Sequence, residues 1–112
     1  MEVVEKQLYD LFVISMRGQI LLCTENECRK YFEKIADEKS NKTVILDMSG
    51  VGYINNAGVN MIVKCIKKFR ENGGRLVFCG LTQEVGKLFD IINLTRLIEV
   101  YPDEETALKN II

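Results

Sequence analysis

Residues 42–69 read KTVILDMSGVGYINNAGVNMIVKCIKKF, and this stretch decides the fold. An apolar run, VIL, ends at Asp47, and a loop that contains glycines separates it from a long segment with helical periodicity. The pattern predicts a buried strand over 43–48, then a loop, then a helix over 56–72. In open α/β sheets such loops lie beside helix N-termini, where unpaired N–H groups and the helix dipole favour anions or polar groups of a partner. We therefore expect the functional surface in this loop and at the start of the helix.

Length and composition are typical of one ordinary globular domain over residues 1–112. Hydrophobic residues make up 47% of the chain and charged residues 28%, as in a folded domain that buries roughly two-thirds of its unfolded surface. The net charge of -1 creates no strong field that would recruit nucleic acid or a membrane. No apolar run approaches the roughly 18 residues of a transmembrane span, and the N-terminus lacks the basic and apolar regions of a signal peptide. We therefore expect a cytoplasmic protein that binds neither nucleic acid nor a membrane.

The chain has four cysteines and no histidine, which argues against a metal site. No two cysteines form a C-x-x-C pair, and zinc would lack its commonest nitrogen ligand. Cys65 and Cys79 lie among apolar residues, whereas Cys23 and Cys28 flank a predicted helix start. We expect reduced thiols with structural roles, and neither a metal nor a cofactor.

The chain before the central strand is predicted to form two strands and a helix. Two short β-prone runs, over 3–8 and 11–16, should pair antiparallel. The segment from Thr24 to Glu27 matches a capping box, and the helical spacing after it predicts a helix over 25–38. The continuous apolar run of the next strand suits a strand that is covered on both faces.

The predicted helix 56–72 has one apolar stripe and a polar opposite face. The stripe consists of Val59, Ile62, Val63, Ile66 and Phe69, and the opposite face holds Asn60, Lys64, Lys67, Lys68 and Glu71. Gly73 and Gly74 then end the helix. The lysines form a local basic patch with Arg70, which we interpret as a solvated helix face.

Two further strands and two further helices complete the predicted fold. Strand 75–79 is followed by a helix over 82–92, which Thr82 caps and whose apolar face is formed by Val85, Leu88, Phe89 and Ile92. Strand 97–101 precedes a last helix that begins with Pro102 and three acidic residues. The fold class is therefore α/β, in the order β-β-α-β-α-β-α-β-α. We expect a single mixed sheet covered by helices, with the first strand antiparallel and the others largely parallel.

Three blocks of the sequence also resemble a known family. They are LDMSGVGYINNAG over 46–58, followed by an apolar helix, then GGRLVFCG over 73–80, then VGKLFD over 85–90. Together they resemble the STAS domain of bacterial anti-sigma factor antagonists, and the resemblance covers nearly the whole chain. Members of that family are small α/β domains with a phosphorylated Ser or Thr at the helix start. The resemblance implies a partner serine kinase that doubles as the anti-sigma factor, which the unphosphorylated domain binds so that the sigma factor is freed.

The loop departs from the family pattern at the residue that carries the switch. With Gly58 aligned to the family glycine, Asn55 stands where Asp is usual and Asn56 stands where Ser or Thr is phosphorylated. Asparagine cannot accept a phosphoryl group, so no phosphorylation is expected at this position, and the role does not transfer to Ser49 or Tyr53. From the residues alone, Asn56 is predicted to be the N-cap of the helix.

The partner surface implied by the resemblance spans residues 49–60. Its predicted contact residues are Asn55, Asn56, Ala57, Gly58 and Asn60. The partner would be a serine-kinase-type anti-sigma factor or a related switch protein, and the switch would not depend on phosphorylation. The sequence predicts no oligomeric state.

Other readings of the sequence have less support. The segment from Gly50 to Asn55 lacks the third glycine of a dinucleotide-binding loop. Asp47 could serve a phosphoaspartate switch like that of response-regulator receivers, although the acidic pair of those proteins is absent. A scaffold subunit of a sensory complex is a further alternative. Without histidine, a nucleophile with its base, or paired carboxylates in one loop, we expect a binding module and not an enzyme.

Overall fold

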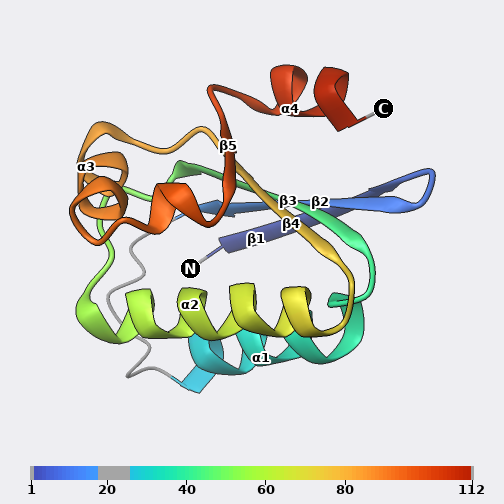
Figure 1. Cartoon of the computed structure of the whole chain (residues 1–112), viewed down its shortest axis with the longest axis horizontal. Helices are drawn as coiled ribbons and strands as arrows, with labels where there is room; N and C mark the ends of the chain where they lie inside the picture. The colour runs from blue at the N-terminus through green and yellow to red at the C-terminus, as the bar shows by residue number, and fades with distance from the viewer. Residues whose placement is uncertain (1, 18–25, 112) are drawn as a thin grey trace.

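A five-stranded mixed sheet with the strand order β1-β2-β3-β4-β5 forms the centre of the computed structural model (Figure 1). The structure describes residues 2–17 and 26–111, and the side chains of the first helix from Arg29 onward. β1 pairs antiparallel with β2, and each later strand pairs parallel with the one before it. The strands are β1 (Glu2–Leu8), β2 (Leu11–Arg17), β3 (Thr43–Gly50), β4 (Arg75–Cys79) and β5 (Glu99–Tyr101). The predicted α/β class and strand directions are confirmed.

Helices cover both faces of the sheet, because the parallel strands need crossover connections. Figure 1 shows α1 and α2 side by side on one face and α4 on the other. The helices are α1 (Asn26–Lys39), α2 (Asn56–Glu71), α3 (Gln83–Ile91) and α4 (Glu104–Ile111), and a short 3-10 helix, η1 (Leu94–Arg96), follows α3. The predicted order of elements is confirmed, with η1 as an addition that the sequence analysis did not predict.

β3 is buried on both of its faces, as its continuous apolar run predicted. Val44 and Leu46 pack in the larger core cluster with residues of α1, α2 and α3. Ile45 points to the opposite face, where it packs with Ala107 of α4 in a smaller cluster. Alternation of side chains along a strand produces this division.

The apolar stripe of α2 fixes the helix against the sheet. Ile62, Ile66 and Phe69 are buried, as predicted, while Val59 and Val63 are half-buried at the edge of the stripe. Cys65 lies in the same buried face, and Cys79 lies in β4 below α4. Both are free thiols, and burial raises the pKa of each to about 12. Their predicted structural role is confirmed.

The end of α2 depends on two glycines for different reasons. Gly73 has a φ of +77°, a conformation that side chains with a Cβ rarely adopt. Gly74 passes so close to the backbone of Ser40 that a Cβ would overlap its carbonyl group. The predicted glycine stop is therefore required both by the turn and by the contact between two loops.

Four expectations need correction or cannot be compared. The last strand begins at Glu99 and not at residue 97, because η1 occupies the preceding residues and leaves Leu97 49% exposed. Ile92 is the C-cap of α3 and is 40% exposed, so it is not part of the apolar face.

α4 begins after Asp103, whose Oδ1 accepts a hydrogen bond from the Thr106 N–H at 2.7 Å, so Pro102 lies before the helix. The predicted capping box at 24–27 cannot be compared, because Cys23, Thr24 and the side chains of Glu27 and Cys28 lie outside what the structure describes.

None of the helices within residues 26–111 is both long and apolar enough to span a membrane.

Candidate functional site

The loop between β3 and α2 is anchored by a buried residue near each end and is exposed between them. Val51 and Ile54 are buried in the main core, Ile54 at 3% exposure, whereas Gly52 and Tyr53 face solvent. Two short-range bonds shape the turn after β3. The Ser49 N–H donates to Asp47 Oδ1 at 3.0 Å, and the Val51 N–H donates to the Met48 carbonyl at 3.0 Å. The apolar anchors thus set where the chain can begin its next helix.

Asn55, and not Asn56, is the N-cap of α2. Its backbone is extended, with φ -86° and ψ 176°, and its Oδ1 accepts a hydrogen bond from the Gly58 N–H at 2.8 Å. Its carbonyl oxygen accepts the first helical bond from the Val59 N–H at 2.9 Å. The cap prediction was therefore wrong by one residue. Asparagine is a good N-cap residue, so residue type does not distinguish Asn55 from Asn56. The burial of Ile54 places the next residue, Asn55, at the cap position.

The predicted contact residues at the start of α2 differ in their access to solvent. Asn56 and Asn60 are exposed, one helical turn apart on the same side of α2. Asn55 and Ala57 are half-buried, and Gly58 is buried. The first turn of α2 contains no acidic residue, so α2 itself supplies no carboxylate to the positive end of its dipole. The exposed part of the site is thus a pair of neutral carboxamides at a helix N-terminus.

Thr82 ties this loop to the start of α3. Its Oγ1 donates a hydrogen bond to the Val51 carbonyl at 3.1 Å and accepts one from the Val85 N–H at 3.4 Å. Thr82 is the N-cap of α3, as predicted. One hydroxyl therefore caps α3 and holds the β3–α2 loop beside it.

A shallow hollow of about 210 Å³ lies where the two helix starts meet. It is lined by Tyr53, Ile54 and Asn56 from the loop side and by Glu84, Val85 and Leu88 from α3. Figure 1 shows the N-terminal end of α2 and the helix α3 on the same side of the molecule. Glu84 and Leu88 were not predicted from the sequence to lie at this surface, although parallel strands bring the helices that follow them to one edge of the sheet.

Asp47 has a local structural partner in this arrangement. Its Oδ1 accepts the Ser49 N–H, and its side chain is only half-exposed. Among the residues that the structure describes, no group of three or more His, Cys, Asp or Glu side chains is arranged to hold a metal ion.

Comparison with known proteins identifies the family. A family model of the STAS domain matches residues 2–107. BtrV of Bordetella bronchiseptica is 30% identical over 70 residues, which are 62% of this chain and 60% of BtrV. An anti-sigma-B factor antagonist of Staphylococcus epidermidis is 24% identical over 91 residues, which are 81% of this chain and 83% of that protein. The solved structure of TM1081 from Thermotoga maritima is similar in fold, with a TM-score of 0.83 at 20% identity over 97% of this chain and 93% of that chain.

Proposed function

The chain belongs to the STAS domain family, and we propose that it is a regulatory binding module of the anti-sigma factor antagonist type. In this proposal residues 49–60 dock a serine-kinase-type anti-sigma factor or a related switch protein, in the cytoplasm and without catalysis. The observation that carries the proposal is the exposed carboxamide of Asn56 at the first helical position of α2. It stands next to exposed Tyr53 and the hollow shared with α3.

The chemistry of this surface favours a partner that donates and accepts hydrogen bonds without charge. A carboxamide offers one acceptor oxygen and two N–H donors, whereas a phosphoserine would add nearly two negative charges. The side chain of Asn56 has no hydroxyl group, so we infer that docking does not depend on phosphorylation at residue 56. The module would be permanently in the state that the family reaches by losing its phosphate.

A negative charge at residue 56 should affect the stability of the fold and the affinity for the partner in different ways. In Asn56→Asp the carboxylate meets the positive end of the α2 dipole, so stability should stay unchanged or rise by about 0.3 to 1 kcal/mol. The same carboxylate would be desolvated against a partner surface that fits a neutral amide, which typically costs several kcal/mol. Calorimetric titration with a serine-kinase-type anti-sigma factor from the same organism should give binding at least tenfold weaker.

The matched control is Asn41→Asp, which introduces the same charge on an exposed turn before β3. That turn lies at the amino end of the strand, whereas the proposed docking surface follows its carboxyl end. The control variant should bind within about twofold of the unmodified chain. Equal affinity of Asn56→Asp and the unmodified chain for a verified partner would remove the loop from the interface.

A second experiment tests the missing switch directly. After incubation with the same kinase, peptide mass analysis should find no phosphate at residue 56 of the unmodified chain. Asn56→Ser should become a substrate, because it restores the hydroxyl at little cost to the helix. Phosphate on Ser49 of the unmodified chain would mean that the switch had moved within the loop.

A further inference from the structure

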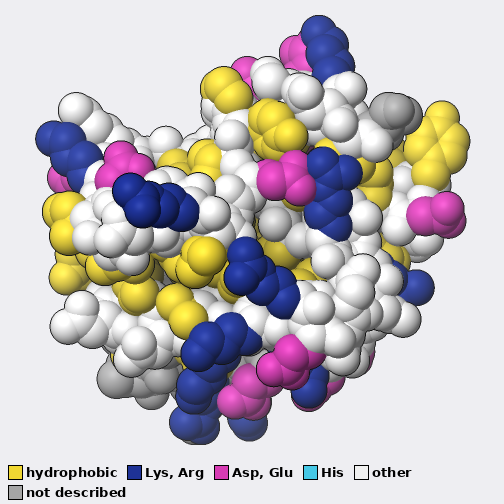
Figure 2. All heavy atoms as spheres, in the orientation of Figure 1, with side chains coloured by type: hydrophobic (Ala, Val, Ile, Leu, Met, Phe, Trp, Pro, Cys, Tyr) yellow, Lys and Arg dark blue, Asp and Glu magenta, His cyan; other side chains and the backbone are white. Residues whose placement is uncertain are grey.

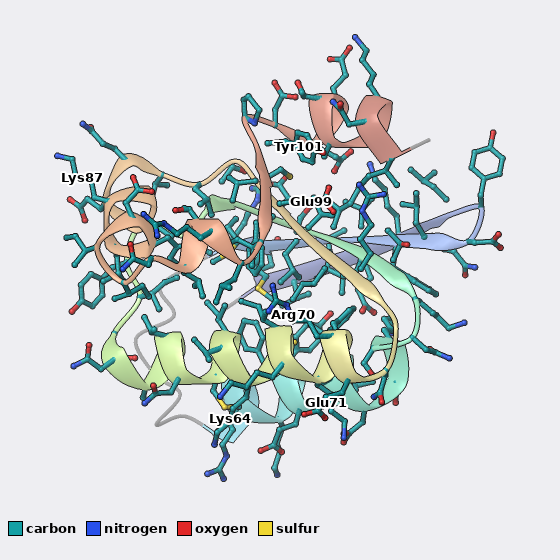
Figure 3. All side chains as sticks on the ribbon, viewed as in Figure 1. Lys64, Arg70, Glu71, Lys87, Glu99 and Tyr101 are labelled. Atoms are coloured by element: carbon teal, nitrogen blue, oxygen red, sulfur yellow. The ribbon has the colours of Figure 1, made fainter. Side chains whose placement is uncertain are left out.

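A second hollow lies at the opposite end of α2, in a groove between α2 and the η1–β5 segment. Its volume is about 330 Å³. The floor is apolar and includes Phe69 and Leu76, and three arginines surround it, namely Arg70, Arg75 and Arg96. Figure 3 shows Arg70 reaching from α2 toward the β5 side of this groove. The groove thus combines an apolar floor with a cationic border.

Of the three arginines, Arg75 forms an ion pair with a carboxylate, whereas Arg70 and Arg96 form none within the described residues. Arg75 is neutralised by Glu99 through two hydrogen bonds of 2.6 Å, and these bonds hold the pKa of Glu99 below its usual range. Arg70 uses one N–H group to bind the Leu97 carbonyl at 3.2 Å. Within the described part of the chain, no ion pair involves Arg70 or Arg96, and both residues are exposed. The border of the groove therefore has two cations that no carboxylate balances.

Exposed apolar side chains are frequent in the segment of the chain that contributes Leu97 to the groove. Seven large hydrophobic residues of the described chain are exposed, and four of them fall within residues 91–100. Ile91 is 77% exposed, and Leu97, which lines the groove itself, is 49% exposed. Figure 2 shows hydrophobic side chains in the band between α2 and the α3–η1 segment, bordered by Lys and Arg side chains. The buried centre of a protein interface is apolar, and arginine is enriched both in interfaces and in their hot spots.

The groove between α1 and α2 shows why charge balance matters. That groove has a similar volume of about 290 Å³, and its apolar floor includes Phe32 and Met61. Its charged residues, however, are matched in number, with Glu33 and Asp37 from α1 facing Lys64 and Lys68 from α2. The η1–β5 groove has no comparable balance, which favours an acidic occupant for it over the α1–α2 groove.

The two ends of α2 are also well separated. Arg70 lies fourteen positions after Asn56 along the helix, which corresponds to roughly 21 Å at a rise of 1.5 Å per residue. The η1–β5 groove is therefore a surface distinct from residues 49–60.

We propose that the η1–β5 groove docks a protein partner through an extended segment that carries carboxylates beside large apolar side chains. The carboxylates pair with Arg70 and Arg96, and an apolar side chain packs on Leu97. Guanidinium groups bind carboxylates through two parallel hydrogen bonds, which gives the contact direction as well as charge. This surface can be occupied whether or not residues 49–60 are engaged.

The test uses the whole chain and a capped hexapeptide of alternating glutamate and leucine as the probe. Two matched peptides replace either all glutamates by glutamine or all leucines by serine. Amide chemical-shift changes measured by NMR should gather at Arg70, Arg96 and Leu97 with the first peptide. Each matched peptide should bind at least about fivefold more weakly, because the groove needs both charge and apolar contact.

Charge reversal locates the contact and checks its specificity. Arg96→Glu should weaken binding of the probe peptide at least tenfold, which corresponds to about 1.4 kcal/mol. Lys87→Glu, an equal reversal on the exposed face of α3 outside the groove, should change the affinity less than about twofold. The Arg96 side chain makes no hydrogen bond or ion pair within the described residues, so its replacement should not disturb the fold. If Arg96→Glu does not fold, Arg96→Gln replaces it in the test, with an expected loss of affinity for the probe peptide of about threefold.

Four results would overturn the proposal. Equal binding of the serine-containing peptide would reduce the contact to general charge attraction, and shift changes centred on residues 56–60 would place the probe on the other surface. Octanoate bound in the groove as tightly as the peptide would make it a site for small amphipathic anions. A dimer of the unmodified chain that Arg96→Glu dissociates would make the groove an interface between two copies of the chain.

Discussion

The two ends of α2 differ in whether charged side chains of the helix complement its dipole. At the C-terminal end Lys68 and Arg70 place positive charge beside the negative end of the dipole. At the N-terminal end the first turn has no acidic residue, and only the neutral cap Asn55 satisfies a first-turn N–H. The residues of α2 therefore complement its dipole at the C-terminal end and not at the N-terminal end. We interpret the uncompensated end as the recognition surface and the compensated end as the cationic border of the η1–β5 groove.

Both ends depend on the buried centre of the helix. Ile62 is fully buried and packs in the main core with residues of the sheet. The stripe holds α2 in one position against β3 and β4, so the carboxamides and the arginines keep a fixed distance from each other. A change in the centre should therefore affect both ends, whereas a change at one end should leave the other intact.

Removal of the central packing should have the largest effect. Ile62→Ala should lower the free energy of unfolding by about 2 to 5 kcal/mol, because it leaves a cavity in a close-packed core. Denaturant titration measures this loss, and Lys67→Ala on the exposed side of α2 should change stability by less than about 0.5 kcal/mol. A loss below about 1 kcal/mol for Ile62→Ala would mean that the stripe does not hold the helix.

The sealed centre of α2 should also protect its thiol. Burial raises the pKa of Cys65 to about 12, so little thiolate forms at pH 8. Because the thiolate is the reactive species, alkylation of Cys65 in the folded protein should be at least about a hundredfold slower than in denaturant. Peptide mass analysis after timed iodoacetamide treatment measures the rate at this residue separately. Fast alkylation at pH 8 without denaturant would show that the centre of the helix opens.

A pair of alanine variants should separate the two asparagines at the N-terminal end. Asn55→Ala removes the acceptor of the Gly58 N–H and should lower stability by about 1 kcal/mol, within a range of about 0.5 to 2. Asn56→Ala should change stability by less than about 0.5 kcal/mol, since alanine is a good helix former at an exposed position. Thermal unfolding of both variants gives the comparison, and equal losses would remove the distinction between cap and contact residue.

Charges placed at the two ends should have small effects on stability, with opposite signs. Asn56→Asp should stabilise the fold by about 0.3 to 1 kcal/mol, and Lys68→Glu should destabilise it by a similar amount. The positive end of the dipole lowers the folded-state pKa of the new aspartate, so its contribution is present above the unfolded pKa of about 3.9 and is lost as pH falls through the folded pKa. Unfolding measured at low and high salt checks both variants, because salt should reduce both effects. Equal signs would contradict the dipole account.

Local sequence patterns were sufficient for the elements and for the family. The apolar run of β3, the stripe of α2 and the glycines after it each depend on neighbours within a few residues, so their structure could be read from spacing. The motifs around Gly58 likewise identified the STAS domain, which the match over residues 2–107 confirms. The neutral residue at position 56 is also a fact of sequence, because no fold can supply the hydroxyl that asparagine lacks.

Errors arose where a local signal was ambiguous and a distant contact decided the outcome. Ile92 matched the apolar spacing of α3, but the helix ends there and leaves the side chain 40% exposed. Leu97 fitted a β-prone run, but η1 precedes it and β5 begins only at Glu99, where pairing with β4 starts. The number of residues that can pair with a neighbouring strand is set by that neighbour, and spacing along one segment does not contain this information.

By itself, the sequence determined the order of the elements, the buried stripe of α2 and the absence of a phosphoacceptor at residue 56. Only the tertiary structure decided that Asn55 caps the helix, because Ile54 just before it is buried in the core. It also decided that Arg70 and Arg96 border one groove while Glu99 neutralises Arg75. Capping type, periodicity and side-chain chemistry are properties of neighbouring residues. Two outcomes depend instead on packing between segments far apart in the chain. One is the choice of Asn55 over Asn56 as the N-cap, and the other is the position of charged side chains from α2, β4, η1 and β5 around one groove.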